Sequence, residues 1–237
     1  NRTKPTTASS IDRGRQVYLS EGCIHCHSRY VRPDTRDELL WGPVIPLDDL
    51  RKEAPVLIGN RRTGPDLLNV GNRRSRGWLK QHFLAPQSLS PRSAMPSYAH
   101  LFAEGSTRGD DLIDFLVAPG LENLSERYQA ISSWQPGEGN GTRVDARRLF
   151  ARSCASCHGP NGEGNGPLAS LWSQPPANLA KGPFAYSAGP DAREKLHRII
   201  KFGIPGTDMP GHETLGDEET IALANFIFGL RGDSPTR

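Results

Sequence analysis

Apolar side chains recur at helical spacing in four short segments, which are separated by long polar stretches. The four apolar faces are formed by Ile11, Tyr18 and Leu19, by Leu112, Phe115 and Leu116, by Ala146, Leu149 and Phe150, and by Leu223, Phe226, Ile227 and Leu230. Ser10 is the expected N-cap of the first segment. The chain holds 20 Pro and 25 Gly, and its best strand-like run, residues 56–58, is brief. This pattern predicts a mainly α protein of short helices and long loops.

The helical pattern is organised as a repeat. Residues 14–27 and 145–158 are each a short helical run that ends on Cys-x-x-Cys-His, and each half closes with an amphipathic helix. Pro119 and Gly120 should end the first domain, and a Gly- and Pro-rich stretch, 136–141, precedes the second copy. A chain of 237 residues is long enough for two domains of about 100 residues each. We therefore predict two consecutive domains, residues 1–120 and 142–237, joined by a linker at 121–141.

Composition and charge narrow the classes of partner. The formal net charge is only +3, and no dense basic stripe with interleaved aromatic residues is present, which argues against nucleic-acid binding. No run of about 18 apolar residues occurs, so no membrane span is expected within the sequence. The sequence begins with Asn1 rather than Met, and we expect that a signal peptide or a membrane anchor stood upstream.

The repeated Cys-x-x-Cys-His motif carries the clearest chemistry. The chain has four cysteines, all within the motif: Cys23 and Cys26 precede His27, and Cys154 and Cys157 precede His158. This spacing is that of c-type haem attachment, in which two thiols bond to the haem vinyl groups and the histidine binds the iron. A zinc ribbon would have its two cysteine pairs about 15–20 residues apart, and a thioredoxin-like pair would need a β-α-β pattern. This sequence has neither feature, which argues against both alternatives. We therefore predict two covalently bound haem c groups.

Each haem iron then needs a sixth ligand or an open position. The chain has only two methionines, Met95 and Met209, one in each half and each followed by proline. A lone methionine usually fills a gap in a core, but two in the same local setting favour thioether ligation of both irons. Such ligation raises the haem potential and closes the iron to substrate. Three histidines near these methionines are rival ligands: His82, His100 and His212.

Residues that would support the ligands also recur. A ligating histidine needs an acceptor for its second ring nitrogen, and a carbonyl in the Gly-Pro turns at Pro65 and Pro167 is expected to supply it. The indole of Trp78 could donate to a haem propionate, and Arg62, next to Arg61, could neutralise one. The alternatives are ordinary turns, plain packing and a solvated surface.

Both halves resemble class I cytochromes c, which combine these helices, the haem motif, a Gly-Pro turn and a Met-Pro loop. Residues 142–232 resemble the generic bacterial domain through the stretches 154–167, 174–179 and 203–210. Residues 13–118 resemble the mono-haem cytochrome subunit of C-family (cbb-type) haem–copper oxidases through the stretches 21–33, 61–67, 78–82 and 93–98. The resemblance implies His27 and Met95 as the first pair of ligands, and His158 and Met209 as the second. That oxidase subunit carries one haem, whereas here a second domain follows.

These observations predict an electron-transfer protein rather than an enzyme. We expect single electrons to pass between periplasmic or membrane-bound respiratory partners, ending at a haem–copper oxidase or a related complex. Two alternatives to the oxidase role are membership of a nitric-oxide-reductase-like complex and a role as a free periplasmic electron shuttle. A di-haem enzyme, of the peroxidase or thiosulfate dehydrogenase type, is the alternative function, and it would need one displaceable axial ligand.

Overall fold

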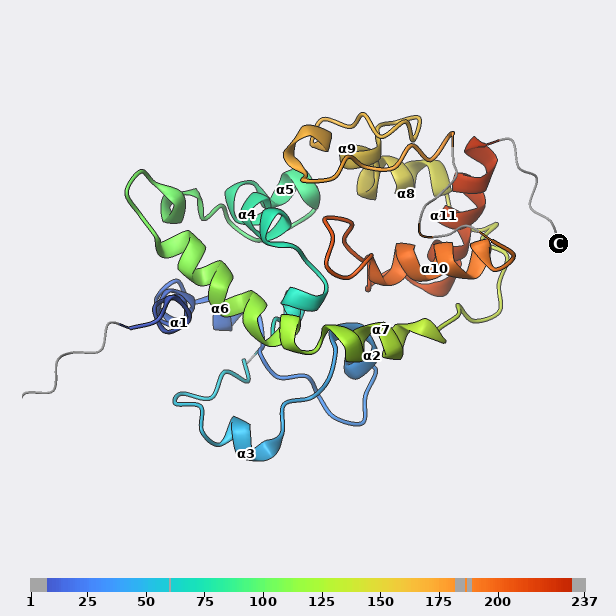
Figure 1. The fold of residues 1–237 in the computed structure, drawn as a ribbon. Coiled ribbons are helices and arrows are strands. Elements are labelled where there is room, and N and C mark those ends of the chain that lie inside the picture. The colour runs from blue at the N-terminus through green and yellow to red at the C-terminus, as the bar shows by residue number, and fades with distance from the viewer. Residues whose placement is uncertain (1–7, 60, 182–185, 187–188, 232–237) are drawn as a thin grey trace, which may run out of the picture. The chain divides into compact units, whose positions relative to one another are not determined.

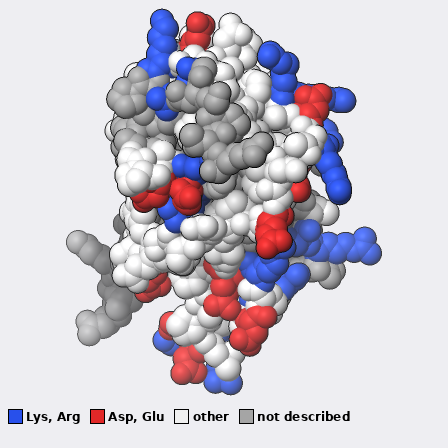
Figure 2. Space-filling model, turned by 90° about the vertical axis from the view of Figure 1, so that its right-hand side faces the viewer, with Lys and Arg blue, Asp and Glu red and all other residues white. Residues whose placement is uncertain are grey.

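The structure is a computed structural model, and it describes residues 8–59, 61–181, 186 and 189–231. Figure 1 shows helices joined by long loops, and no β-strand occurs in these residues. The mainly α fold class is thereby confirmed. On the face shown in Figure 2, basic and acidic side chains are intermixed. In the described part of the chain, no helix is both long enough and apolar enough to cross a membrane.

The chain forms two compact units that do not follow one another along the sequence. The first unit comprises Asn1–Asn72 and Tyr98–Arg127, and the second comprises Arg73–Ser97 and Tyr128–Arg237. The segment 73–97 therefore belongs to the second unit, although the repeat in the sequence assigns it to the first domain. Each unit is described by itself below.

The first unit is built around two long helices, α1 (Ser10–Ser20) and α6 (Arg108–Glu122). Tyr18 of α1 packs against Phe115 of α6, with ring centroids 5.7 Å apart. The remaining elements are short: η1 (Cys23–His25), α2 (Asp37–Trp41), α3 (Leu47–Leu50), η2 (Val70–Asn72) and η3 (Ala99–Phe102). The cap of α1 is Ser9 rather than the expected Ser10, because Ser9 and Asp12 form a capping box.

The first closing helix runs beyond the predicted end of the first domain. Pro119 lies inside α6, and the helix continues to Glu122. The physical reason is tertiary packing: a Cβ on Gly120 would lie 2.5 Å from the backbone nitrogen of Asn72, so the helix backbone lies directly against η2. That contact outweighs the local tendency of proline to break a helix. The predicted linker at 121–141 also holds a helix, α7 (Leu124–Ser132).

The second unit holds a helical core and the segment 73–97. Its core helices are α8 (Ala146–Ser153), α10 (Ala192–Phe202) and α11 (Asp217–Leu230), with α9 (Ala155–His158) and η4 (Ala169–Leu171) beside them. A buried cluster in this unit contains Leu149, Phe150, Leu196, Ile200, Leu223 and Ile227. The segment 73–97 supplies α4 (Arg76–Leu84) and α5 (Pro86–Leu89). The apolar faces predicted for residues 146–150 and 223–230 therefore meet in one core.

Candidate haem-binding sites

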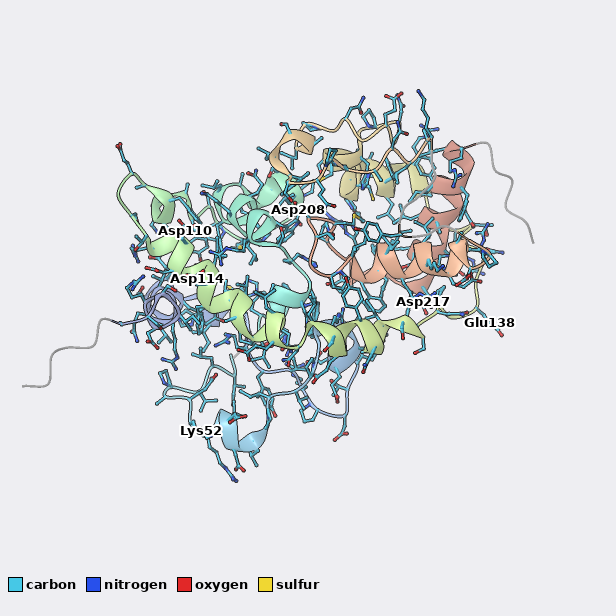
Figure 3. The ribbon with its side chains drawn as sticks, viewed as in Figure 1. Lys52, Asp110, Asp114, Glu138, Asp208 and Asp217 are labelled. Atoms are coloured by element: carbon cyan, nitrogen blue, oxygen red, sulfur yellow. The ribbon has the colours of Figure 1, made fainter. Side chains whose placement is uncertain are left out.

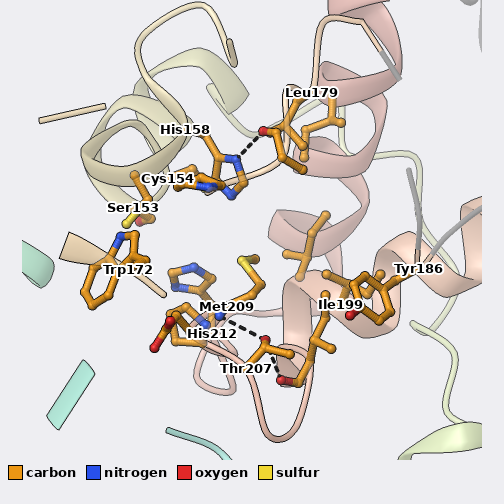
Figure 4. A pocket seen from close by; sticks show the side chains of 18 of the residues that line it. Ser153, Cys154, His158, Trp172, Leu179, Tyr186, Ile199, Thr207, Met209 and His212 are labelled. Atoms are coloured by element: carbon orange, nitrogen blue, oxygen red, sulfur yellow. Dashed lines mark hydrogen bonds between the residues drawn. The ribbon is translucent and has the colours of Figure 1, made fainter. Parts of the chain in front are cut away.

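The second unit contains an apolar cavity of about 330 Å³. Figure 4 shows the side chains that line it. Cys154, Cys157 and His158 face it from the end of α8 and from α9, and Met209 faces it from the loop between α10 and α11. The structure thus brings together all four residues that the sequence marked as haem-binding in this half.

His158 is held in one orientation by the chain backbone. Its Nδ1 lies 3.0 Å from the carbonyl oxygen of Ala177, which favours the tautomer with the proton on Nδ1 and leaves the Nε2 lone pair for a metal. Burial lowers the pKa of the imidazole, which keeps it neutral. We expected the carbonyl of Pro167 as the acceptor. Instead, the Gly-Pro turn closes onto α9, where the Gly166 N–H donates to the carbonyl of Cys157 at 3.0 Å.

The two thiols of the motif lie in apolar surroundings. Burial raises the pKa of Cys154 to about 12, and burial likewise raises the pKa of Cys157. Both cysteines are free thiols in the structure and both line the cavity. Two thiols and one histidine are therefore aimed into a single hydrophobic space, as covalent haem attachment requires.

Met209 is presented by a short hairpin-like loop. The N–H of Ile204 donates to the carbonyl of Met209 at 3.0 Å, and the N–H of Met209 donates to Oγ1 of Thr207 at 3.2 Å. Figure 4 shows the Met209 sulfur pointing into the cavity, toward the side from which His158 enters. His212, one of the rival ligands, also lines the cavity. Burial, followed by the nearby charge of Arg74, lowers the pKa of His212 to about 4.

Trp172 is a cavity residue that the sequence analysis missed. Its side chain is buried and lines the cavity, and its Nε1 has no nitrogen or oxygen partner among the described residues; the thiol of Cys157 is the polar group beside it. A buried indole N–H without an acceptor is costly, and a haem propionate would supply one. A signal was available: Trp172 is the only tryptophan between the second haem motif and Met209.

The first haem motif lies in the first unit. Nδ1 of His27 is 2.8 Å from the carbonyl oxygen of Pro65, the acceptor proposed from the sequence. Gly64 makes this approach feasible, because a Cβ there would lie 2.7 Å from Nδ1 of His27 and would overlap the ring. Cys23 is half-buried, and burial raises its pKa to about 11, whereas Cys26 is exposed. The orientation of His27 therefore depends on the Gly-Pro turn, unlike that of His158.

All three guanidinium nitrogens of Arg62 have protein partners, and the contact to a propionate stays a prediction. Its guanidinium donates to Asp37 at 2.7 Å, to the hydroxyl of Ser28 at 2.8 Å and to the carbonyl of Tyr30 at 3.0 Å. Asp66 accepts hydrogen bonds from the same stretch, including one from the N–H of Tyr30 at 2.8 Å. Arg62 and Asp66 therefore fasten the Gly-Pro turn to the residues that follow His27, because both groups need buried counterparts.

Met95 and Trp78 belong to the second unit, on the segment 73–97, whereas His27 belongs to the first. The carbonyl of Met95 accepts a hydrogen bond from Nε2 of Gln87 at 3.0 Å. Trp78 stacks on His82, with ring centroids 4.7 Å apart, and its buried Nε1 has no hydrogen-bond partner among the described residues. This unpaired N–H is compatible with the predicted contact to a propionate.

The remaining rival ligand of the first haem has a partner elsewhere. Nε2 of His100 lies 3.0 Å from one carboxylate oxygen of Glu21, and the guanidinium of Arg108 donates to the other oxygen at 2.5 Å. His100 therefore takes part in a polar cluster with Glu21 and Arg108.

The cavity of the second unit has the volume and the side chains that a covalently bound haem c group requires. Its volume of about 330 Å³ falls within the usual range of cofactor sites, about 300–1,000 Å³. Its walls are mainly apolar, and the side chains that line it include the two thiols, the two proposed iron ligands and the indole of Trp172. Each of these features meets a separate requirement of a covalently bound haem.

Comparisons with known proteins agree with this chemistry. Residues 1–116 match the family "Cytochrome C oxidase, mono-heme subunit/FixO", and residues 144–231 match the family "Cytochrome c". Two curated relatives are Cbb3-type cytochrome c oxidase subunits FixP. The one from Sinorhizobium medicae is 27% identical over 131 residues, which are 54% of this chain and 42% of the relative. The one from Rhizobium meliloti is 26% identical with the same coverage.

The matched part of the chain therefore spans less than half the length of these relatives.

Among solved structures, a Kuenenia stuttgartiensis reducing HAO-like protein complex matches with a TM-score of 0.33 and 19% identity, covering 92% of this chain and 96% of that one. A score at this level carries no argument about fold or function. The family matches and the cavity agree instead: residues 1–116 match the mono-haem FixO family of cytochrome c oxidase subunits, and residues 144–231 match the Cytochrome c family.

Proposed function

We propose that this protein is a di-haem electron relay, with one haem c in each of the domains 1–120 and 142–237. The proposed axial ligands are His27 and Met95 for the first haem, and His158 and Met209 for the second. The observation that carries the proposal is the apolar cavity that both His158 and Met209 face, together with the two thiols of the motif. The matching motif in the first half, Cys23 to His27, supports the first haem by repetition.

The protein's own groups favour a relay over an enzyme. A bound haem supplies a one-electron iron couple. His158, neutral and fixed by Ala177, offers one nitrogen to the iron, and Met209 offers a thioether from the opposite wall. If His158 and Met209 both bound the iron of a haem in this cavity, no coordination position would remain for a substrate. The apolar walls exclude water, which limits the reorganisation that accompanies a change of charge.

The electrons are proposed to pass to a haem–copper terminal oxidase or a related complex, from a donor protein on the periplasmic side of the inner membrane. Two observations support this partner class: the FixO match over residues 1–116 and the relatives that are named as cbb3-type oxidase subunits. The weak positive net charge, +3, suits transient contact with another redox protein rather than with nucleic acid.

The test is to purify the protein from a host that matures c-type cytochromes. We expect an intact mass that includes two haems, and the Met–iron absorption band in the oxidised spectrum. Carbon monoxide should leave the reduced spectrum unchanged, because both irons hold two protein ligands. A single haem, or a spectrum that shifts fully with carbon monoxide, would contradict the proposal and would point to the enzymatic alternative.

A further inference from the structure

Two consecutive arginines of the segment 73–97 bind the loop that carries Met209. Arg74 donates to both carboxylate oxygens of Glu213, at 3.0 and 2.8 Å, and to the carbonyl of Gly211 at 2.8 Å. Arg73 lies 3.6 Å from the same carboxylate. The side chain of Glu213 is only 3% exposed, so these ion pairs are shielded from water. The loop is thus bound four residues after Met209.

A second contact holds the loop on the other side of Met209. The hydroxyl of Ser75 donates to Asp208, the residue directly before Met209. The other carboxylate oxygen of Asp208 accepts from the N–H and the hydroxyl of Ser173, at 3.1 and 2.8 Å. Figure 3 labels Asp208 near α4 and α5. Because the carboxylate is charged, each of these hydrogen bonds is stronger than a neutral one.

The segment that binds this loop also presents Met95. Gln87 on α5 donates to the carbonyls of Ser93 and Met95, at 3.1 and 3.0 Å. The hydroxyl of Ser97 donates to the carbonyl of Leu84, at the end of α4, at 2.8 Å. Helices α4 and α5 therefore hold the Met95 loop at one end, while the residues just before α4 hold the Met209 loop.

We propose that Arg74 and Ser75 are positioning residues for Met209, and that the segment 73–97 thereby serves both methionine loops. The proposal rests on the proposed function, which makes Met209 a haem ligand. The Met209 loop is closed by hydrogen bonds of its own at Ile204, Thr207 and Met209, and Arg74 and Ser75 add charged contacts from outside the loop on both sides of Met209. Glu213 cannot leave Arg74 without exposing a buried charge, and Asp208 cannot move without losing three hydrogen bonds.

The contact of Ser75 is the most direct one to test. Ser75 also caps α4, because its hydroxyl accepts from the N–H of Trp78 at 3.0 Å. Ser75→Ala removes both roles. Ser75→Asp keeps a capping oxygen but places a second carboxylate against Asp208, and Ser75→Thr keeps both hydrogen bonds. Ser88→Ala is the matched control, because Ser88 lies in the same segment and its hydroxyl bonds, within the described part of the chain, to Gln81 and Ala85.

The readouts are hydrogen exchange and the properties of the second haem. We expect Ser75→Ala and Ser75→Asp to speed exchange of the Ile204, Thr207 and His212 amides about tenfold, which corresponds to about 1.4 kcal/mol. The Met–iron absorption of the second haem should weaken and its midpoint potential should fall, since a loosened thioether raises the potential less. Ser75→Thr and Ser88→Ala should match the unaltered protein.

The outcomes separate this inference from the proposed function. If the unaltered protein holds two haems with Met–iron absorption but Ser75→Asp changes neither exchange nor potential, the positioning role is refuted and the relay stands. If Ser75→Ala acts but Ser75→Asp does not, the effect belongs to the α4 cap and the inference is again refuted. If the unaltered protein lacks Met–iron absorption at the second haem, the proposed function itself fails.

Discussion

Nδ1 of His158 lies 3.0 Å from the carbonyl oxygen of Ala177, nineteen residues further along the chain. In the first unit the corresponding nitrogen of His27 lies 2.8 Å from the carbonyl of Pro65. The two histidines thus solve the same problem with acceptors from different parts of their domains. The repeat in the sequence preserves the motif but not the surroundings that orient its histidine.

The turn before Pro65 provides a selective way to disturb the first site. Gly64→Ala should displace the His27 ring, because the added methyl group would overlap it. We expect the intact mass to show loss of the first haem while the second is retained. Gly229→Ala is the control, since nothing lies within 4 Å of a Cβ there. Equal haem content in both variants would contradict the close contact between Gly64 and His27.

The ligand role of Met209 can be separated from its packing. Met209→Leu keeps an apolar side chain of similar volume but removes the thioether, so one iron should lose its sixth protein ligand. Carbon monoxide should then shift about half of the reduced haem absorption. Met95→Leu should do the same at the other haem, and the double variant should respond fully. An unchanged response to carbon monoxide in Met209→Leu would assign the ligand elsewhere, with His212 as the first candidate.

Arg62 distinguishes a structural role from a role at a propionate. Arg62→Met removes a largely buried guanidinium that binds Asp37, Ser28 and Tyr30. We expect the free energy of unfolding to fall by about 3 kcal/mol, because Asp37 and its neighbours lose a buried counterpart. Chemical denaturation measures this loss. A large change in the first haem potential with no change in stability would instead favour the propionate contact.

The indole of Trp172 is expected to act through its N–H. Trp172→Phe keeps an aromatic ring but removes the N–H donor, which has no nitrogen or oxygen partner among the described residues. If this N–H serves a propionate, the midpoint potential of the second haem should fall, because the propionate charge is then less compensated. Thermal stability should change by less than about 1 kcal/mol. An unaltered potential would show that the indole serves packing alone.

The buried carboxylate of Glu213 makes the second unit sensitive to acid. Burial alone would raise its pKa, but the charges of Arg74 and Arg73 and the hydrogen bond from Arg74 outweigh burial and lower the pKa to about 2. Because the folded pKa lies below the ordinary value of 4.5, the unfolded chain takes up the proton first as the pH falls. The stability that Glu213 contributes should be complete above about pH 4.5 and should decline toward pH 2.

Denaturation of the haem-loaded protein between pH 6 and pH 2 measures this dependence. Glu213→Gln should lower the stability at pH 6 and flatten its decline below pH 4.5, since the neutral amide does not titrate. A decline of equal steepness in both proteins would assign the acid sensitivity to other carboxylates.

The helices could be predicted from the sequence because their signals are local. The apolar faces at residues 11–19 and 223–230 follow the helical period, and both segments lie in helices, α1 and α11. The helix around Pro119 could not be predicted correctly, because its continuation depends on the contact between Gly120 and Asn72. A proline such as Pro119 shows only that the chain locally disfavours a helix at that position, and tertiary packing can override this preference.

For the sites, the sequence by itself determined which side chains carry the chemistry. Cys154, Cys157 and His158 lie within five consecutive positions. Local geometry is therefore enough to direct all three side chains into one cavity. Only the tertiary structure decided what surrounds them: Ala177 as the acceptor of His158, Trp172 at the cavity wall, and Arg74 bound to Glu213. These partners lie far apart along the chain. Their pairing depends on burial and charge complementarity, which arise only when the helices and loops have packed together.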